Sequence, residues 1–367
     1  MNKTVYMGHK VIIAGGGTGG HIFPAIAIAR ALQRKQPDID LLFVGARGKM
    51  EMEKVPEAGY KIIGLNIAGM NRGSWLKNLT LPFKIVSSLR RAGRIIKTFR
   101  PDVVIGVGGY ASFPVLNVAQ SRGIPTLIQE QNAFAGKTNV LLGKKAFKVC
   151  VAAKGMELFF PKNRIVLTGN PVRKNIVQGL GDQQAALQHF GLQAGKKTVF
   201  IVGGSLGARS INEALMASLD QLQDIQLIWQ TGTTSQAAVE AAVADRKAGI
   251  KVFAFIADIE KAYAAADVVI SRAGALALAE LSVVGKPVIF VPFPHAAEDH
   301  QTKNAASFVK ADAALMVADA AARTELVPTL RGLLADEKLQ RRLATHIKER
   351  AITNADDRIA NEILKLV

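Results

Sequence analysis

A histidine that directly follows a glycine turn is the first residue of this chain whose type and position suit chemistry. Residues 11–25, VIIAGGGTGGHIFPA, are an apolar strand, a run of small residues and then His21 at the mouth of an expected helix. The positive end of a helix favours the neutral imidazole, which is the form that accepts a proton. Two interpretations of this loop are open: it holds a cofactor phosphate, or it leaves room for His21 to act on a substrate.

The glycines of this turn also match the dinucleotide-binding pattern G-x-G-x-x-G, at Gly15, Gly17 and Gly20, which alone is a weak signal. A dinucleotide site needs an acidic residue at the end of the second strand, about 20 residues on, to bind the ribose hydroxyls. The second expected strand, LLFVGARG at 41–48, ends without one. A nicotinamide cofactor is therefore disfavoured, and His21 becomes the candidate for catalysis.

The elements that must position these residues alternate short apolar strands with helical stretches, which indicates parallel sheets flanked by helices. The pattern occurs twice. A strand that ends in glycines before a helix recurs at 197–208, KTVFIVGGSLGA, and a DVVI strand followed by a strand that starts with G-x-P recurs in the same order. We predict an α/β fold of two doubly wound, Rossmann-like domains. Because ligands bind such sheets at the C-terminal ends of the strands, we expect the two glycine loops to face each other across a cleft.

The domain boundary is expected near VLTGNPVRKN, residues 166–175, where Gly169, Asn170 and Pro171 interrupt regular structure. We predict a first domain over 1–168 and a second over 169–349. A C-terminal helix at about 350–367 is expected to pack back on the first domain.

The composition is that of a globular α/β protein, because 49% of the 367 residues are hydrophobic. No run of about 18 apolar residues predicts a transmembrane helix, and the first ten residues carry no apolar signal region. We therefore expect the protein to remain in the cytoplasm. The single cysteine, Cys150, allows no internal disulfide and is expected in the core.

Positive charge is concentrated in the first half of the chain. Residues 1–170 hold 25 Lys and Arg against 8 Asp and Glu, a net charge of 25 − 8 = +17, whereas residues 171–367 hold 22 against 21. A basic half indicates an anionic partner: nucleic acid, an anionic lipid surface or a phosphorylated substrate. No helix-turn-helix, zinc-ligand pattern or aromatic stacking motif supports nucleic acid.

Residues 72–100 carry eight basic residues and no acidic one, with apolar side chains between them. Apolar anchors in a basic surround suit an anionic bilayer surface. The alternative is a core helix with a solvated basic face. The candidates for membrane docking are Trp75, Leu76, Leu79 and Phe83.

Seven short motifs then occur in a specific order along the chain. They are GGGTGGHIFPA (15–25), GGYASFP (108–114), EQNAFAGKTN (130–139), LTGNPVR (167–173), GGSLGA (203–208), SRAGALALAEL (271–281) and HQTKNA (300–305). By these motifs the chain resembles, over essentially its whole length, the MurG family of bacterial cell-wall transferases, which belongs to the two-domain glycosyltransferases of GT-B type. The resemblance implies inverting transfer of N-acetylglucosamine from UDP-N-acetylglucosamine to the 4-hydroxyl of lipid-linked N-acetylmuramoyl-pentapeptide (lipid I), which gives lipid II.

The resemblance places the donor diphosphate at the second glycine loop, GGSLGARSIN. Backbone N–H groups and the following helix end can cradle a diphosphate there without a metal, and Ser205 adds a hydroxyl donor. Arg173 is implied to reach the same phosphates, and the Glu280 carboxylate suits the two ribose hydroxyls. The other implied donor contacts are Asn132, Ile256, Gln301 and the segment Ala275, Leu276, Ala277, Leu278 and Ala279. Family members often carry a hydroxyl residue where this chain has Ala277, so only backbone can serve at that position.

Inversion needs a base on the acceptor hydroxyl and stabilisation of the departing UDP. His21 is the first candidate for the base and Glu130 the second. The remaining implied contacts are Thr18, Gly19 and Gly20 near the donor sugar, with Tyr110 and Asn139 on the acceptor side.

The expected partners are UDP-N-acetylglucosamine, lipid I and the anionic cytoplasmic face of the cell membrane. Other proteins of cell-wall synthesis or cell division are further candidate partners. No cofactor, metal or nucleic acid is expected; the DID triplet at 38–40 resembles a metal-binding D-x-D motif but precedes its strand. Three alternatives are open. They are another UDP-sugar enzyme of this fold (a lipid glycosyltransferase or an epimerase), an NAD(P)-dependent oxidoreductase, and a non-catalytic basic binding protein.

Overall fold

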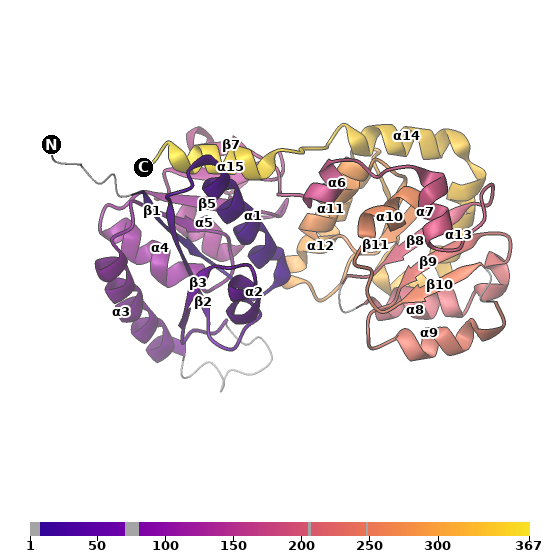
Figure 1. Cartoon of the computed structure of the whole chain (residues 1–367), viewed down its shortest axis with the longest axis horizontal. Helices are drawn as coiled ribbons and strands as arrows, with labels where there is room; N and C mark the ends of the chain where they lie inside the picture. Colours follow the sequence, from indigo (N-terminus) through magenta and orange to yellow (C-terminus); the bar gives the residue numbers. More distant parts are fainter. Residues whose placement is uncertain (1–7, 70–80, 205–206, 247–248) are drawn as a thin grey trace. The chain divides into compact units, whose positions relative to one another are not determined.

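The computed structural model describes residues 8–69, 81–204, 207–246 and 249–367 (Figure 1). The chain divides into two compact units, residues 1–171 with 354–367 and residues 172–353. Each unit is a parallel sheet with helices on its faces, which confirms the predicted pair of doubly wound, Rossmann-like domains. The prediction divided the chain at 168 and 349; in this division the first unit also keeps the turn that contains Asn170, and the chain returns to the first unit at residue 354.

The first unit has a seven-stranded sheet in the order β3-β2-β1-β4-β5-β6-β7. The strands are β1 (Lys10–Ala14), β2 (Asp40–Ala46), β3 (Lys61–Leu65), β4 (Val103–Gly106), β5 (Thr126–Glu130), β6 (Lys148–Val151) and β7 (Ile165–Leu167). The helices are α1 (Gly19–Lys35), α2 (Glu51–Glu57), α3 (Leu81–Phe99), α4 (Ser112–Ser121), α5 (Lys137–Gly143) and α15 (Ala355–Leu364), with 3₁₀ turns at Met156–Leu158 and Lys162–Arg164.

The second unit has a six-stranded sheet in the order β10-β9-β8-β11-β12-β13. The strands are β8 (Thr198–Val202), β9 (Gln226–Gln230), β10 (Ile250–Phe253), β11 (Val268–Ser271), β12 (Val288–Phe290) and β13 (Leu315–Met316). The helices are α6 (Lys174–Val177), α7 (Gln183–His189), α8 (Arg209–Met216), α9 (Gln236–Ala242), α10 (Ile259–Ala265), α11 (Ala275–Val284), α12 (His300–Val309), α13 (Ala322–Ala335) and α14 (Glu337–Lys348). The 3₁₀ turns are Leu219–Leu222, Ala244–Arg246, Ala297–Asp299 and Asp319–Ala321.

The central strands carry buried apolar side chains on both faces, because both faces of each sheet are covered. Successive residues of a strand point to opposite faces. In β1, Val11 and Ile13 belong to one buried cluster while Ile12 belongs to another, and Val199 and Phe200 in β8 divide in the same way. Each such side chain contributes about 1.5–3 kcal/mol by leaving water, so these strands hold the loops at their ends in place.

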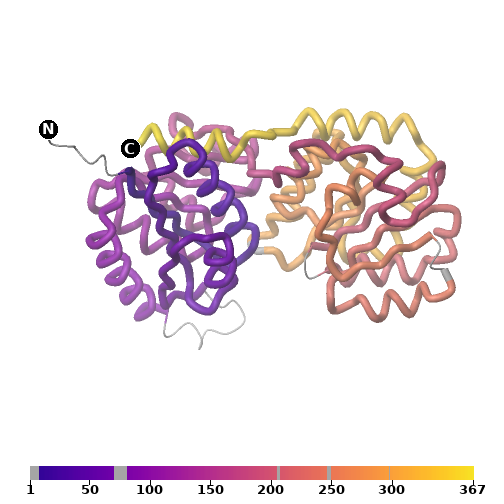
Figure 2. The backbone as a smooth tube through the Cα atoms, in the orientation of Figure 1, coloured from indigo at the N-terminus to yellow at the C-terminus, as the bar shows by residue number. Residues whose placement is uncertain are grey.

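Helix α15 joins the first unit although it follows the whole second unit in the chain (Figure 2). Ile359 and Ile363 lie in the same buried cluster as the inner face of α1. Arg34 of α1 donates to Asp356 at 2.8 Å and to Asp357 at 3.2 Å. This C-terminal helix spans Ala355–Leu364, so it is shorter than the expected 350–367. None of the helices within the described ranges is both long and apolar enough to cross a membrane.

Candidate functional site

The first glycine loop, residues 15–18, connects β1 to α1 at the switch point of its sheet, where β1 lies between β2 and β4. Gly16 N donates to the carbonyl oxygen of Gly108, at 3.3 Å, so the loop lies directly against the turn that follows β4. Residues 19 and 20 begin α1, with Thr18 as the N-cap residue. The predicted donor-sugar residues Thr18, Gly19 and Gly20 are thus one helix start.

A buried glutamate that sequence reasoning missed supports this loop. Glu51 is 1% exposed, and its carboxylate accepts from Gly17 N and from Ala46 N, both at 2.9 Å. A Cβ atom at Gly16 would lie 2.2 Å from Glu51 Oε1, and one at Gly45 would lie 2.5 Å from Glu51 Cγ. The absence of side chains at these two glycines makes the space for the carboxylate, but the glycines alone do not show which residue fills it.

His21 lies in the first turn of α1 with its ring held by the loop. Nδ1 is 3.2 Å from the carbonyl oxygen of Gly16 and 3.2 Å from Thr18 Oγ1. A carbonyl oxygen only accepts, so Nδ1 carries the hydrogen in that contact and Nε2 of the neutral ring holds the lone pair. The Nε2 edge of the ring lies over Gly108, where a Cβ atom would be 2.8 Å from Nε2. The geometry therefore suits a base that acts through Nε2.

Glu130, at the end of β5, is buried and fully engaged in hydrogen bonds. Oε1 accepts from the backbone and side chain of Asn132 at 3.0 and 3.2 Å. Oε2 accepts from Gly136 N at 3.2 Å and from Asn139 Nδ2 at 2.8 Å. Burial raises the pKa of Glu130, and these donors oppose the rise. Glu130 thus ties the loop that carries Asn132 to Asn139 on α5, the residues predicted for donor and acceptor.

An amide network that was also missed joins three strand ends of this sheet. Gln131 Nε2 donates to Val107 O at 2.6 Å and to the side-chain oxygen of Gln129. Gln129 Nε2 donates to Asn170 Oδ1, and Asn170 Nδ2 donates back to Gln131 O, each at 2.9 Å. Neutral glutamines carry no signal of such pairing in a sequence, because the partners lie up to 41 residues apart.

Tyr110 follows the same turn as Gly108 and lies beside the first glycine loop. A Cβ atom at Gly17 would be 3.7 Å from its ring, and one at Gly69 would be 3.0 Å from it. Burial, with a smaller contribution from the Glu51 charge, raises the pKa of Tyr110. The structure thus brings His21, Thr18 and Tyr110 together at one end of the first sheet.

The second glycine loop follows β8, and two of its residues, 205 and 206, lie outside the described ranges, so the Ser205 prediction is not described. The flanking loop is held by Gln230, which is 2% exposed. Its Nε2 donates to Gly204 O at 3.1 Å and its Oε1 accepts from Ile256 N at 2.9 Å. Because the N–H of Ile256 is bonded within the protein, the predicted backbone contact of this residue with uracil would use its carbonyl oxygen.

Arg173 and Glu280, predicted to bind phosphate and ribose, bind each other. Arg173 Nε is 2.6 Å from Glu280 Oε1, and Nη2 is 2.7 Å from Oε2. Burial lowers the pKa of Arg173, but the hydrogen bonds and charge of Glu280 outweigh it, so the pKa lies above its ordinary value. A bidentate pair of this kind is among the stronger hydrogen-bonded contacts in proteins. It places both side chains at the start of α6 and on α11, in one unit.

The other predicted donor residues of the second unit lie on α11 and α12, the helices that follow the neighbouring strands β11 and β12. Residues 275–280 form the first turns of α11, where Leu278 and Glu280 are buried and the others are partly exposed. Gln301, on α12, accepts through Oε1 from Phe293 N at 2.9 Å. Its amide NH₂ is thus the end suited to donate to a sugar hydroxyl.

Of the membrane-docking candidates, Trp75, Leu76 and Leu79 lie outside the described residues. Phe83, in the first turn of α3, has 80% of its surface exposed. It lines a groove of about 1180 Å³ along α3 whose wall also carries Arg90, Arg91 and Arg94. Within the described ranges, groups of three or more His, Cys, Asp or Glu placed to hold a metal ion are absent.

Two doubly wound units with glycine loops at their switch points are the architecture of two-domain glycosyltransferases of the nucleotide-sugar type. Comparison with known families agrees: residues 11–151 match the glycosyltransferase family 28 N-terminal domain, and residues 198–361 match its C-terminal domain.

A curated relative from Parabacteroides distasonis is 49% identical over 98% of both chains, and one from Bacteroides thetaiotaomicron is 50% identical over 97% of both. Both are named UDP-N-acetylglucosamine--N-acetylmuramyl-(pentapeptide) pyrophosphoryl-undecaprenol N-acetylglucosamine transferase. The crystal structure of Acinetobacter baumannii MurG is 33% identical, with a TM-score of 0.81, over 97% of this chain and 99% of that one. The chain belongs to this MurG family of N-acetylglucosaminyltransferases.

Proposed function

We propose that the protein transfers N-acetylglucosamine from UDP-N-acetylglucosamine to the lipid-linked N-acetylmuramoyl-pentapeptide, with inversion at the sugar carbon. The observation that carries this proposal is the identity of about half the residues over 98% of both chains to a transferase of that name. An epimerase or an oxidoreductase of the same fold does not account for identity at that level along both units.

His21 is the proposed base. The acceptor hydroxyl gives its proton to Nε2, its oxygen bonds to the anomeric carbon, and the bond from that carbon to the UDP oxygen breaks with its electron pair leaving on UDP. The carbonyl of Gly16 supports this role, because it orients Nδ1–H and stabilises the imidazolium that forms. Glu130 serves as the residue that positions Asn132 and Asn139 rather than as the base.

The departing diphosphate is stabilised by the second unit. The N-terminus of α8 follows the second glycine loop, and a helix N-terminus favours an anion. Arg173 and Glu280 reach phosphate and ribose by exchanging their mutual contact for the donor. This exchange needs no metal ion to balance the diphosphate charge.

The test is calorimetry with UDP, UDP-N-acetylglucosamine and NAD(P), followed by transfer assays on a lipid-linked acceptor with and without excess EDTA. We expect binding of both uridine nucleotides and turnover in EDTA. Binding of NAD(P) in preference to UDP would overturn the proposed function. Loss of turnover in EDTA that magnesium or manganese restores would contradict its metal independence alone.

We further propose that α3 and the segment before it bring the enzyme to the cytoplasmic face of an anionic membrane. The support is the +17 charge of residues 1–170, the exposed Phe83 and the arginines of the α3 groove. Each basic residue near such a surface contributes about 1 kcal/mol, screened over about 8 Å at physiological salt. Phe83→Ser should reduce co-sedimentation with anionic vesicles, while Phe255→Ser, an exposed phenylalanine of the second unit, should not. Equal binding by native protein and Phe83→Ser would place docking elsewhere.

A further inference from the structure

Arg272 is a partly buried arginine with an unusually large set of contacts, and the reaction proposed above assigns it no role. It follows directly on β11, in the loop that leads to α11. Its side chain is 12% exposed, and that of its partner Asp319 is 21% exposed. A charged group this sheltered needs several hydrogen bonds to offset its lost hydration.

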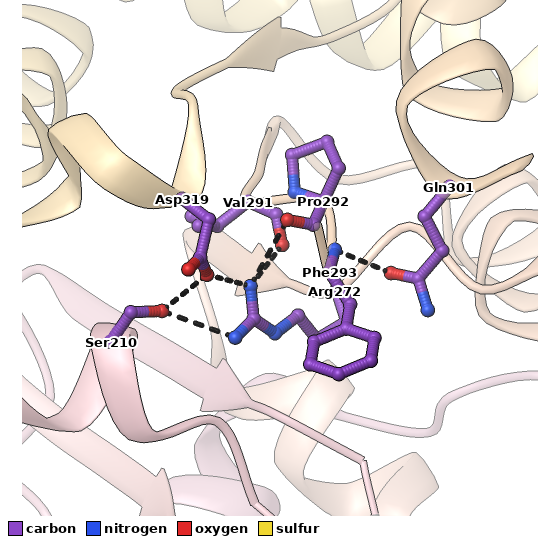
Figure 3. A network of polar contacts seen from close by, with 7 residues as sticks. All are labelled: Ser210, Arg272, Val291, Pro292, Phe293, Gln301 and Asp319. Carbon is purple, nitrogen blue, oxygen red and sulfur yellow. Dashed lines mark hydrogen bonds and ion pairs between the residues drawn. The ribbon is translucent and has the colours of Figure 1, made fainter. Parts of the chain in front are cut away.

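Those hydrogen bonds connect four segments of the second unit (Figure 3). Arg272 Nη1 donates to Val291 O at 2.9 Å, to Pro292 O at 3.2 Å and to the carboxylate of Asp319. Arg272 Nη2 donates to Ser210 Oγ at 3.1 Å, and the Ser210 hydroxyl donates in turn to Asp319. The guanidinium thus joins the start of α8, the end of β12 and the turn after β13 to its own loop.

Three of these four segments lead to a predicted donor contact. Ser210 is the second residue of α8, which the second glycine loop precedes. The carbonyls of Val291 and Pro292 come just before Phe293, whose N–H fixes Gln301. Arg272 itself comes shortly before residues 275–280 in the chain. The guanidinium is therefore the shared anchor of three loops at one edge of the sheet.

We propose that Arg272 is a positioning residue for the nucleotide-sugar donor, acting by holding the α8, α11 and α12 loops in one arrangement. This inference rests on the proposed function, since it takes those three loops to be the donor site. Only a planar guanidinium, with its several donors in a fixed fork, satisfies a carboxylate, a hydroxyl and two carbonyls at once. Lysine has a single ammonium group and spans fewer of these acceptors. The Phe293 ring, whose centroid is 5.6 Å from Arg272 Cζ, adds a cation–π contact.

The experiment measures donor binding by calorimetry and the donor and acceptor KM for Arg272→Gln, Arg272→Lys and Ser210→Ala. Arg331→Gln is the matched control, because Arg331 makes a paired but more exposed contact with Asp224, at 2.7 and 2.9 Å, in the same unit. We expect Arg272→Gln to weaken UDP-N-acetylglucosamine binding at least about tenfold, with Arg272→Lys in between and Ser210→Ala about threefold. Acceptor KM should stay unchanged, and Arg331→Gln should bind as the native protein does.

A purely structural role would lower the melting temperature and leave the donor Kd of the folded protein unchanged, which would overturn the proposal. If Arg272→Gln does not fold, Ser210→Ala decides in the same way, since it removes only the two contacts of the Ser210 hydroxyl and keeps the Arg272–Asp319 charge pair. Native protein that binds no UDP-N-acetylglucosamine would instead refute the proposed function itself.

Discussion

The two glycine loops occupy the same place in two similar sheets, but their surroundings are chemically opposite. The strand next to the first loop, β4, is followed by Gly108, which has no side chain and leaves room for the His21 ring. The strand next to the second loop, β11, is followed directly by Arg272, whose guanidinium fills the corresponding region with hydrogen bonds to neighbouring loops. One topology therefore provides space in the first unit and a rigid cationic anchor in the second.

The residues beneath the loops differ in the same systematic way. Glu51 faces two N–H groups, so a carboxylate with two acceptors fits. Gln230 faces one carbonyl and one N–H, so an amide with one donor and one acceptor fits. The comparison teaches that each buried side chain matches the donors and acceptors of the backbone groups it meets. The following experiments test that match, and they test whether the first unit serves catalysis while the second binds the donor.

The largest effect is expected at the base. His21→Ala should reduce kcat by about 10²–10⁴, because proton removal from the acceptor loses its general base. UDP binding should be unchanged, since the second unit supplies it. Steady-state kinetics and calorimetry measure both quantities. His9→Ala, at the opposite end of β1, is the control, and near-normal turnover of folded His21→Ala would assign proton removal to another group or to water.

A methyl group added beside the first glycine loop, at Gly108, and one added in the second glycine loop, at Gly207, should separate catalysis from donor binding. In Gly108→Ala the Cβ would lie 2.7 Å from His21 Cδ2, and a displaced base costs about 10²-fold in kcat. In Gly207→Ala the Cβ would lie 1.9 Å from Thr231 O, so the second loop must move and UDP affinity should fall.

Gly123→Ala provides the control for this pair, since Gly123 has a φ of +73° and its added Cβ would meet no described atom within 4 Å. It carries backbone strain without a clash near either loop. If both loop variants lose kcat and UDP affinity alike, the proposed division of roles between the units is wrong.

Removing the Glu280 carboxylate tests the donor side directly. Glu280→Ala should weaken donor binding by about 1.5–3 kcal/mol, the range for hydrogen bonds to a charged group. Arg173→Ala and the double variant complete a double-mutant cycle, which measures the interaction free energy of the Arg173–Glu280 pair separately from donor binding. Unchanged donor affinity in Glu280→Ala would remove this residue from the site.

Replacing Glu51 by glutamine and Gln230 by glutamate should lower the free energy of unfolding by similar amounts. Glu51→Gln puts an NH₂ group against an N–H, and Gln230→Glu puts a carboxylate oxygen against Gly204 O. Each leaves one mismatched buried contact, so the free energy of unfolding should fall by about 1–3 kcal/mol. Urea denaturation measures both. A neutral result for either exchange would show that its backbone partners are satisfied by other means.

The smallest effect is expected at Cys150, and it distinguishes the units. Burial is the main cause that raises the pKa of this thiol, to about 12, so almost no reactive thiolate exists at pH 8 in the folded protein. Because Cys150 is the only cysteine and lies in the first unit, thiol labelling reports opening of that unit. Glu51→Gln should accelerate labelling, and Gln230→Glu should leave it unchanged. Rapid labelling of the native protein would contradict the burial of this thiol.

The architecture was predictable because its signals are local. Apolar strands that end in glycines, repeated in order, indicate two doubly wound sheets, and His21 was recognisable from its position after such a turn. Glu51 was not, because it stands in the helix Glu51–Glu57 with two other glutamates and looks like them. Only the packing of α2 under the loop distinguishes it. Arg173 and Glu280 are 107 residues apart in the chain, and the hydrogen-bond partners of Arg272 are up to 62 residues away from it. A single sequence does not show that such distant residues are in contact.

The place of α15 has a consequence for synthesis on the ribosome. The inner face of α1 is covered by Ile359 and Ile363, which are translated after the entire second unit. At about 5–20 residues per second, the intervening 353 − 171 = 182 residues take roughly 10–40 s to make. During that interval the first unit has its sheet but lacks one of its covering helices. A nascent chain therefore presents an apolar strip to chaperones until the last helix emerges, and the second unit has the opportunity to fold first.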